Sequence, residues 1–523
     1  MPRVLVTEKL AETGLDLLRS AGHEVDVQLD LDEEGLIAAV PGAHALIIRS
    51  ATNVTRDVLE AADSLRIVGR AGVGLDNVDT VTATRLGVIV ANAPTSNSVS
   101  AAEHTMALLL SVARNVPQAH KALVEGRWER SRWGGVELLD KTLGIVGLGN
   151  IGGLVAHRAR AFGMRLVGHD PFVSPERAAE LGVELMTLDE LVPQSDFLTL
   201  HLARTPETVG LIGAERLKLA KPNLRLINVA RGGIVDEAAL AEAITNGTIG
   251  GAALDVFDSE PMTTSPLFEL ERVVVTPHLG ASTSEAQDRA GLTIADQVRL
   301  ALADDFVPFA VNVSAGGVSE LVRPFLPLAE QLGVQFARLV GGRPGSVDIV
   351  FAGEIGGVDC QMAVLAVTKG LLSELSDVPV SYVNAERLAR EYDVKIQFRT
   401  STKTPSGLVN GIRLDGDGHS IAGTLALLSG DARIVAIDDI IVDLAPSDYM
   451  LLVINDDTPG MIGTVGTIFG DAQINIDDMH LARASSGHAL MAISTSVPIP
   501  DHVIRLLEAL DTIVSVKSLG VRG

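Results

Sequence analysis

Cysteine is almost absent from this chain of 523 residues. Its single cysteine, Cys360, excludes an intramolecular disulfide and any metal site built from several thiolates. Aromatic residues make up only 3% of the sequence, so its hydrophobic cores must be aliphatic. The longest apolar runs, such as residues 106–112, are too short to span a bilayer. No basic segment precedes an apolar run at the start, so we expect no secretory signal and a soluble, cytoplasmic protein.

Positive charge is also scarce. Lys and Arg number 42 against 66 Asp and Glu, which gives a formal net charge of −24. This balance argues against nucleic acid as a partner. An anionic substrate would therefore need a local cluster of cations. The length predicts about three or four domains. We predict no metal site and no membrane partner.

A glycine-rich turn dominates the middle of the sequence. Thr142–Val146 is typical of a buried strand, and Gly147, Gly149 and Gly152 follow at G-x-G-x-x-G spacing before a helical pattern over 154–162. Strand, glycine turn and helix in this order form the dinucleotide fingerprint. The glycines permit the tight turn, the close approach of a pyrophosphate, and close packing of helix on strand.

The residues around this turn favour NAD as the cofactor. Backbone N–H groups near Asn150 and Ile151, at the helix start, suit a phosphate. Asp170 ends the next strand, about 20 residues on, where a carboxylate holds the ribose hydroxyls of NAD and repels the 2′-phosphate of NADP. The alternative is a structural glycine turn with an unrelated aspartate.

Alternating strand and helix patterns flank this fingerprint and predict parallel α/β sheets. The first 95 residues lack a dinucleotide loop of their own. Ser100–Glu103 has the spacing of a capping box that opens a helix toward Asn115, and a long helix over 282–303 is expected to return to the first unit. We predict a Rossmann-type NAD domain at 98–282 with six strands, inserted into a flavodoxin-like substrate domain made of 1–97 and 283–308.

Beyond residue 308 the pattern changes. Residues 309–446 predict an α+β domain with strands at 347–351, 396–398 and 434–437, and turns at Gly411 and 415–418. We find no catalytic constellation there. Residues 447–523 read strand, helix, strand, strand, helix, strand, the ferredoxin-like βαββαβ order.

Candidate catalytic residues follow three late strands of the NAD domain, at the edge where open α/β sheets bind ligands. His278 is suited to accept a hydroxyl proton, and Glu260 to hold its ring. Arg231 can grip a carboxylate with its planar fork. Asp255 can accept a hydrogen bond from the nicotinamide carboxamide. Each alone is common in loops or turns, but together they favour hydride transfer from a hydroxy acid.

These segments resemble the D-2-hydroxy-acid dehydrogenase family over residues 1 to about 308. In ARGG, DVF, EP and TPHLGAST, the family's catalytic positions match Arg231, Glu260 and His278 one by one. The resemblance implies that the cofactor is also contacted by residues on both sides of these motifs. These are Val229, Ala230, Arg231, His278, Leu279, Gly280 and Ala281.

Within that family, RAGVGLDNVD (70–79) and NAPTSNSVSAAEH (92–104) resemble the D-3-phosphoglycerate dehydrogenase subfamily. The resemblance implies NAD-dependent oxidation of 3-phospho-D-glycerate to 3-phosphohydroxypyruvate, the first step of phosphorylated L-serine synthesis. It also implies a set of substrate contacts besides Arg231 and His278. They are Arg49, Ser50, Asn97 and the backbone of Val73 and Gly74, with Lys141 and Arg132 as further candidates for the phosphate.

The carboxyl-terminal part resembles an ACT domain, and the middle part resembles the allosteric substrate-binding domain of the long form of this subfamily. The resemblance implies L-serine as an effector at Asn455, Asp457 and Asn475, of which the first two depart from the best-known version. It also implies a homotetramer that pairs through the NAD domain, with residues 128–133 contributing.

Two alternatives stay open on the sequence. One is a dehydrogenase for another D-2-hydroxy acid, such as a hydroxypyruvate or 2-oxoglutarate reductase. The other is an NAD-sensing binding protein that keeps the fold without the activity. Assays with phosphorylated and unphosphorylated acids separate these alternatives.

Overall fold

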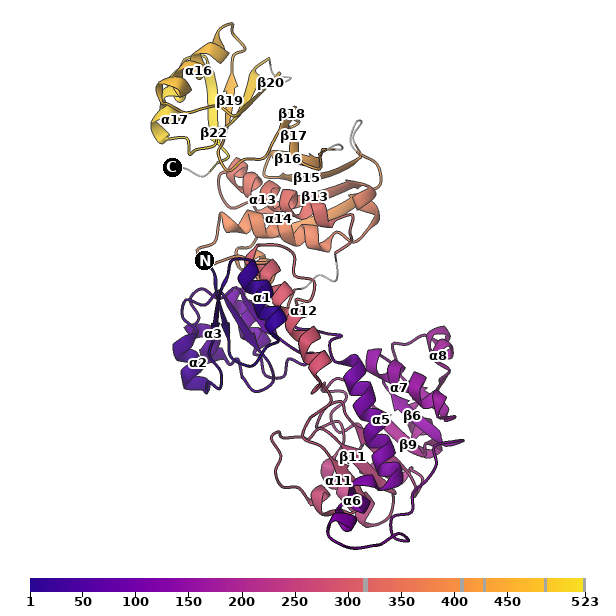
Figure 1. Cartoon of the computed structure of the whole chain (residues 1–523). Coiled ribbons are helices and arrows are strands. Elements are labelled where there is room, and N and C mark those ends of the chain that lie inside the picture. The colour runs from indigo at the N-terminus through magenta and orange to yellow at the C-terminus, as the bar shows by residue number, and fades with distance from the viewer. Residues whose placement is uncertain (314–317, 405–408, 427–428, 484–486, 521–523) are drawn as a thin grey trace.

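The computed structural model describes residues 1–313, 318–404, 409–426, 429–483 and 487–520. It arranges the chain as four units in a row (Figure 1). The amino-terminal unit lies between the unit with the glycine-rich turn and the two carboxyl-terminal units. Among the described residues, no helix combines the length and hydrophobicity needed to cross a lipid bilayer.

The first unit is a parallel sheet with strand order β2-β1-β3-β4-β5, the predicted flavodoxin-like order. The predicted return helix is confirmed as α12 (Ser284–Leu302), which packs against α1 and β4. A Cβ at Gly14 would lie 2.8 Å from the carbonyl oxygen of Gly291, so glycine at this crossing lets α1 and α12 approach closely. The other elements are β1 (Arg3–Val6), α1 (Glu12–Ser20), β2 (Glu24–Val27), α2 (Glu33–Ala39), β3 (Ala45–Ile48), α3 (Arg56–Ala61), β4 (Ile67–Arg70), α4 (Thr80–Leu86) and β5 (Ile89–Ala91).

The second unit is a parallel sheet of seven strands in the order β12-β11-β10-β9-β6-β7-β8. This is the doubly wound arrangement, but the prediction of six strands missed β8, which has only two residues and no apolar run. The elements are α5 (Ser98–Arg114), α6 (Val116–Val124), β6 (Thr142–Val146), α7 (Asn150–Ala161), β7 (Arg165–His169), α8 (Pro175–Leu181), β8 (Glu184–Leu185), α9 (Leu188–Gln194), β9 (Phe197–Leu200), α10 (Ala214–Lys218), β10 (Arg225–Asn228), α11 (Glu237–Thr245), β11 (Gly251–Leu254), η1 (Pro266–Glu269) and β12 (Val273–Val275).

Helix α5 carries the chain from the first unit into the second. The predicted capping box is wrong, because the helix begins at Ser98 and the Ser100 hydroxyl is hydrogen-bonded to the Thr283 hydroxyl at 2.7 Å. Thr283 is itself the N-cap of α12. The two connections between the units therefore touch each other at their helix starts.

The third unit has a six-stranded sheet, ordered β14-β13-β15-β16-β17-β18, with α13 and α14 packed together beneath it (Figure 1). The predicted turns at Gly411 and Asp415 are wrong, because both residues belong to β15. There Ile412 and Leu414 alternate into the core, and only Asp417 and Gly418 make the hairpin turn. The elements are η2 (Arg323–Phe325), α13 (Leu326–Val340), β13 (Ser346–Gly353), η3 (Glu354–Gly357), α14 (Gln361–Ser373), α15 (Ala385–Glu391), β14 (Lys395–Ser401), β15 (Asn410–Gly416), β16 (His419–Leu425), β17 (Ala432–Ile437) and β18 (Ile440–Leu444).

The fourth unit confirms the predicted βαββαβ order. Its antiparallel sheet is ordered β20-β21-β19-β22. Met450, Leu452 and Leu490 extend from this sheet into the core of the third unit, so the two carboxyl-terminal units share one hydrophobic cluster. The elements are β19 (Met450–Asn455), α16 (Met461–Asp471), β20 (Asp478–Arg483), β21 (Ala489–Ser494), α17 (Asp501–Glu508) and β22 (Ile513–Ser518).

Candidate active site

The glycine loop has the geometry that the fingerprint predicts. Gly147 has φ +92°, and a Cβ there would collide with the carbonyl oxygen of His201. Gly152 lies directly against the backbone of Gly147. A Cβ at Gly149 would meet no atom within 4 Å, so open space lies over the loop. Helix α7 begins beside that space without a side-chain cap, and its first N–H groups are available to a pyrophosphate.

Asp170 lies at the end of β7 and is tied to the glycine loop. Its carboxylate accepts hydrogen bonds from the backbone N–H of Leu148 at 2.8 Å and of Phe172 at 2.9 Å. The acidic group is therefore held beside the loop, as binding of a ribose diol requires. These residues fit NAD, because the loop provides room and N–H donors and Asp170 provides the acceptor.

His278 and Glu260 form a hydrogen-bonded pair. His278 Nδ1 lies 2.6 Å from Glu260 Oε2, and Glu260 Oε1 accepts the backbone N–H of Phe257 at 2.9 Å. Burial alone would raise the pKa of Glu260, but the hydrogen bonds from His278 and Phe257 outweigh it and hold this pKa below its ordinary value. The second imidazole nitrogen of His278 is left free of Glu260, as a proton acceptor requires.

This pair lines a cavity of about 520 Å³ between the first two units. Arg49, Ser50 and Asn97 line the same cavity, and the substrate contacts predicted for them stay predictions. The Asn97 side-chain oxygen is buried without a hydrogen-bond partner, so it is an acceptor available to a ligand. The rest of the lining includes Gly72, Ser96, Phe257, Met262, Pro277, Ala281, Ser282 and Gln287.

Arg70 also lines the cavity, and no role was predicted for its side chain. Its Nε atom is buried without a partner, and the guanidinium lies over Gly72. Burial, followed by the charge of Arg231, lowers its pKa. Arg70 ends β4, so the strand-end rule applied to the first sheet would have found it.

Arg231 lies near this cavity but is not part of its lining. Its Nε atom is 3.3 Å from a carboxylate oxygen of Asp76, and its guanidinium packs against Gly74. Val73 is held by Asn92, which donates to its carbonyl at 2.7 Å. Arg231 thus connects the loop after β10 with the predicted substrate loop of the first unit.

Asp255 is fully buried at the end of β11. Its carboxylate accepts hydrogen bonds from the Thr276 hydroxyl and from the backbone N–H groups of Leu279 and Gly280. It therefore organises the turn that carries His278. The cofactor contact predicted for Asp255 stays a prediction, as do those of Ala281, which follows this turn, and of Val229 and Ala230 on the loop after β10.

Two predicted phosphate ligands lie at the wrong edge of the sheet. Lys141 precedes β6 and Arg132 is paired with Glu271, just before β12. Both positions are at the amino ends of strands, whereas the cavity lies at the carboxyl ends. Within one chain, Lys141 and Arg132 therefore do not reach this cavity, and their phosphate contact stays a prediction that requires a second copy.

His201 was not predicted and lies beside the glycine loop. It follows β9, and its ring lies 3.1 Å from the Thr199 hydroxyl. Burial lowers the pKa of His201 to about 4, so its ring is neutral near neutral pH. Within the described ranges, no cluster of three or more His, Cys, Asp or Glu side chains is arranged to bind a metal ion.

The predicted effector residues do not converge in one chain. Asn455 and Asp457 line a cavity of about 460 Å³ in the fourth unit. Asn455 Oδ1 accepts the Asp457 backbone N–H, and Asp457 pairs with Arg483 at 2.8 Å. Asn475 precedes β20, whose first residue pairs with Ser494 at the other end of the sheet.

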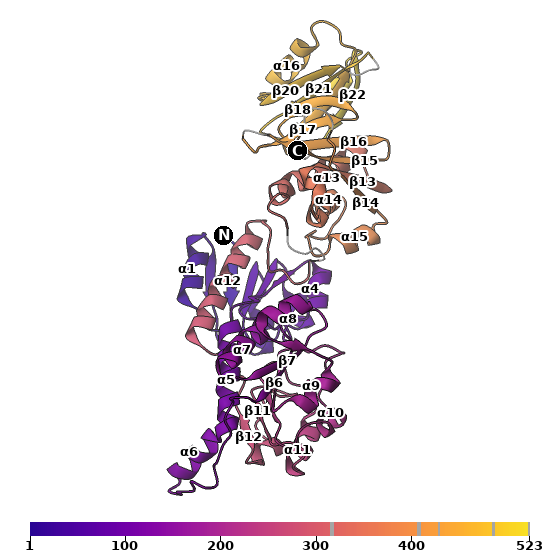
Figure 2. The same ribbon diagram turned by 90° about the vertical axis from the view of Figure 1, so that its right-hand side faces the viewer.

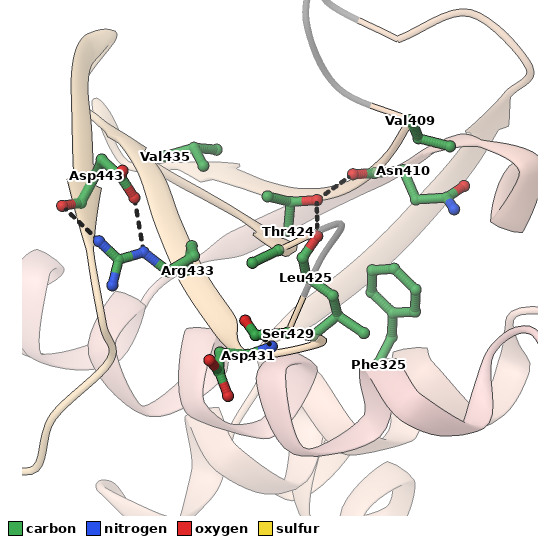
Figure 3. A pocket seen from close by; sticks show the side chains of 11 residues that line it. Phe325, Val409, Asn410, Thr424, Leu425, Ser429, Asp431, Arg433, Val435 and Asp443 are labelled. Atoms are coloured by element: carbon green, nitrogen blue, oxygen red, sulfur yellow. Dashed lines mark hydrogen bonds and ion pairs between the residues drawn. The ribbon is translucent and has the colours of Figure 1, made fainter.

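A further cavity of about 630 Å³ lies in the third unit (Figure 3). Its cation, Arg433, donates from Nε to Asp443 Oδ1 at 2.6 Å and from Nη2 to the Asp443 carbonyl. Its other polar groups include Ser429, Thr424 and Asp431.

Three family models match the chain. The NAD-binding domain of D-isomer specific 2-hydroxyacid dehydrogenases matches residues 106–280. The D-3-phosphoglycerate dehydrogenase intervening domain matches 321–438, and the ACT domain matches 449–512.

Curated relatives match over nearly the whole length. The chain is 46% identical to a D-3-phosphoglycerate dehydrogenase of Mycobacterium bovis over 510 residues, which are 96% of each chain. It is 38% identical to one of Methanocaldococcus jannaschii over 99% of each chain. The TT0316 protein of Thermus thermophilus has a solved structure that matches 59% of this chain and 99% of its own, with 36% identity and a TM-score of 0.56. A D-lactate dehydrogenase of Aquifex aeolicus, complexed with NAD and lactic acid, matches 58% of this chain and 96% of its own, with 28% identity and a TM-score of 0.52.

Proposed function

The chain belongs to the D-3-phosphoglycerate dehydrogenase family of D-isomer specific 2-hydroxyacid dehydrogenases, and we propose that it oxidises 3-phospho-D-glycerate to 3-phosphohydroxypyruvate with NAD. One observation supports the assignment of the active site to the cavity between the first two units. A hydrogen-bonded His278–Glu260 pair lines the same cavity as Arg49 and Arg70, and among the described residues neither guanidinium group forms an ion pair.

The oxidation removes a proton from the substrate hydroxyl and a hydride from its carbon. His278 accepts the hydroxyl proton on Nε2, because Nδ1 is held by Glu260. The Glu260 carboxylate stabilises the imidazolium that forms. NAD, held by the glycine loop and Asp170, supplies the hydride acceptor when bound. Arg231, on the loop after β10, orients the substrate carboxylate.

The two remaining cations of the cavity, Arg49 and Arg70, bind the phosphate of the substrate. Arg49 and Arg70 lie on the first unit, across the cavity from the base, and no ion pair neutralises either among the described residues. In a chain with net charge −24, two unpaired guanidinium groups in one cavity create a local site for an anion. The Asn97 side-chain oxygen is a further buried acceptor at this cavity.

A substrate comparison tests the function. NADH formation is measured with 3-phosphoglycerate, D-glycerate, D-lactate and D-2-hydroxyglutarate at equal NAD. We expect kcat/KM to be largest for 3-phosphoglycerate by at least about 10², since the phosphate contacts are charge-assisted hydrogen bonds. Preference for an unphosphorylated acid would contradict the proposed substrate. NAD binding without turnover of any of these acids would indicate a sensing protein instead.

The domain division at 1–97 with 283–308, 98–282, 309–446 and 447–523 is part of the same proposal. The two parallel sheets and the return of α12 to the first of them support it. We also propose a cytoplasmic homotetramer with L-serine as its effector. In a single copy Asn455 and Asn475 lie at opposite ends of one sheet, so a site using both requires two copies.

An exposed apolar arm supports association through the second unit. Helix α6 projects from that unit (Figure 2), and Val124 and Trp128 are 73% and 82% exposed. Exposed apolar groups that lie close together mark contact surfaces. Light scattering of the Trp128→Ser variant tests this contact, with a smaller assembly as the expected result. An unchanged assembly would contradict a role for the arm.

A further inference from the structure

The buried Asp255 carboxylate accepts hydrogen bonds from three groups of the turn 276–280, which carries the base His278. The Thr276 hydroxyl donates to its Oδ1 at 2.5 Å and the Leu279 N–H donates to the same atom at 2.7 Å. The Gly280 N–H donates to Oδ2 at 2.8 Å. These donors lie on both sides of His278, which has φ +54°, an uncommon conformation for a residue other than glycine. The carboxylate therefore helps to hold His278 in a backbone conformation that it would rarely adopt alone.

A second histidine reaches the same carboxylate from helix α5. His104 Nε2 lies 3.1 Å from Asp255 Oδ1 and 3.0 Å from the Thr276 hydroxyl oxygen. Because the Thr276 hydroxyl donates to Asp255, the His104 nitrogen must be the donor to both oxygens. Among the hydrogen bonds of the described residues, it is the one that Asp255 receives from a side chain outside the turn.

Helix α5 also begins at the substrate cavity. Its first residue follows Asn97, which lines that cavity. One turn before His104, Ser100 is hydrogen-bonded to Thr283 at the end of the base-carrying segment. The base-carrying segment is therefore held to α5 at both ends of the segment, by His104 at Thr276 and by Ser100 at Thr283. The start of α5 lies beside the substrate cavity.

We propose that His104 is a positioning residue for the dehydrogenase reaction. Its hydrogen bonds to Asp255 and Thr276 hold the turn 276–280 against α5, and so set the place of the His278 ring relative to the substrate held beside Asn97. The inference rests on the proposed function, because it assigns His104 a role in that reaction. The role belongs to the N–H donor and not to the volume of the ring.

Two substitutions separate the donor from the volume. His104→Leu introduces an apolar side chain of similar volume that has no hydrogen-bond donor. His104→Gln keeps a neutral N–H donor of about the same reach. His157→Leu, at an exposed position on α7 of the same unit, is the matched control. For each variant, kcat and KM are measured with 3-phosphoglycerate and NAD, together with the melting temperature. The deuterium isotope effect on kcat is measured with substrate labelled at the carbon that loses hydride.

We expect His104→Leu to lower kcat by at least about tenfold with KM changed much less, since misplacement of a reacting group is felt in the chemical step. Its isotope effect should rise above that of the wild type. His104→Gln should recover most of kcat, and His157→Leu should match the wild type. Wild-type kcat and isotope effect in His104→Leu would overturn the inference, and so would equal losses in the Leu and Gln variants with an unchanged isotope effect. Absence of turnover in the wild-type chain would instead count against the proposed function.

Discussion

Two cavities of similar size lie in the two halves of this chain, and their charges differ. The cavity between the first two units, of about 520 Å³, is lined by Arg49 and Arg70, neither of which forms an ion pair with a residue that the structure describes. The cavity of the third unit, of about 630 Å³, has Arg433 already bound to Asp443 (Figure 3). Cavity size therefore does not distinguish them, but the pairing of their cations does.

The sheets explain this difference. In the first two units all strands are parallel, so the loops after several strands meet at one edge and bring His278, Glu260 and Arg70 together from distant positions. In the third unit most neighbouring strands are antiparallel, and the Arg433 side chain on β17 reaches Asp443 on the adjacent β18. In this pair the two side chains neutralise each other, so Arg433 is not available to an anionic ligand.

Removal of the base should give the largest effect on the first cavity. We expect His278→Ala to lower kcat by at least about 10², because a general base contributes at least that much. NAD affinity, measured by isothermal titration calorimetry, should stay near the wild-type value. The exposed His502 of the fourth unit provides the control, and His502→Ala should keep full turnover. Equal activity in His278→Ala and His502→Ala would contradict the assignment of catalysis to the first cavity.

Neutralising the partner of the base should have a smaller effect and a pH signature. The pKa of Glu260 is held below its ordinary value, so its carboxylate is ionised at neutral pH and favours the protonated imidazole. In Glu260→Gln this stabilisation is lost. We expect kcat to fall at least about tenfold and the acidic limb of the kcat/KM profile to move to lower pH. A limb that stays in place, or moves to higher pH, would contradict the pairing.

Arg70 should affect substrate binding more than turnover. We expect Arg70→Ala to raise KM for 3-phosphoglycerate about tenfold, the equivalent of one charge-assisted hydrogen bond. KM for D-glycerate, which lacks the phosphate, should change less. Arg70→Lys should recover part of the loss, since it restores the charge without the planar fork. An equal change for both acids would show that Arg70 does not bind the phosphate.

The corresponding substitution in the second cavity should have the smallest effect. We expect Arg433→Ala to change kcat and KM less than about twofold, and the free energy of unfolding by about 1 kcal/mol or less, as for other partly exposed ion pairs. Chemical denaturation and the steady-state assay measure the two quantities. A tenfold change in KM would show that the third unit contributes to substrate binding.

The sequence predicted those parts of the site that a strand end determines. The glycine loop, Asp170, Glu260 and His278 follow strands with clear apolar runs, so their place at one edge follows from the parallel fold. The Arg70 side chain was missed because the motif at 70–79 was interpreted only for the backbone contacts of Val73 and Gly74. His104 was missed because it acts from a helix through a buried carboxylate, a contact that no local spacing indicates. Lys141 and Arg132 lie at the amino ends of strands, away from the cavity of their own chain, which residue type alone does not indicate.

Patterns were weakest in the third unit. Gly411 and Asp415 looked like turns, although the alternation of Ile412 and Leu414 places them in β15. Glycine and aspartate are frequent in turns, but the burial of neighbouring residues in a sheet overrides that preference. The two-residue strand β8 has no apolar pattern of its own and is recognised by its parallel pairing with β7.

The most direct test of the central claim is a comparison of substrates on the unaltered chain and on His278→Ala. With NAD present, the unaltered chain should form NADH rapidly from 3-phosphoglycerate and slowly from D-glycerate, and the variant should bind NAD but form almost none. NADH formation from 3-phosphoglycerate that is the same with and without His278 would contradict the account.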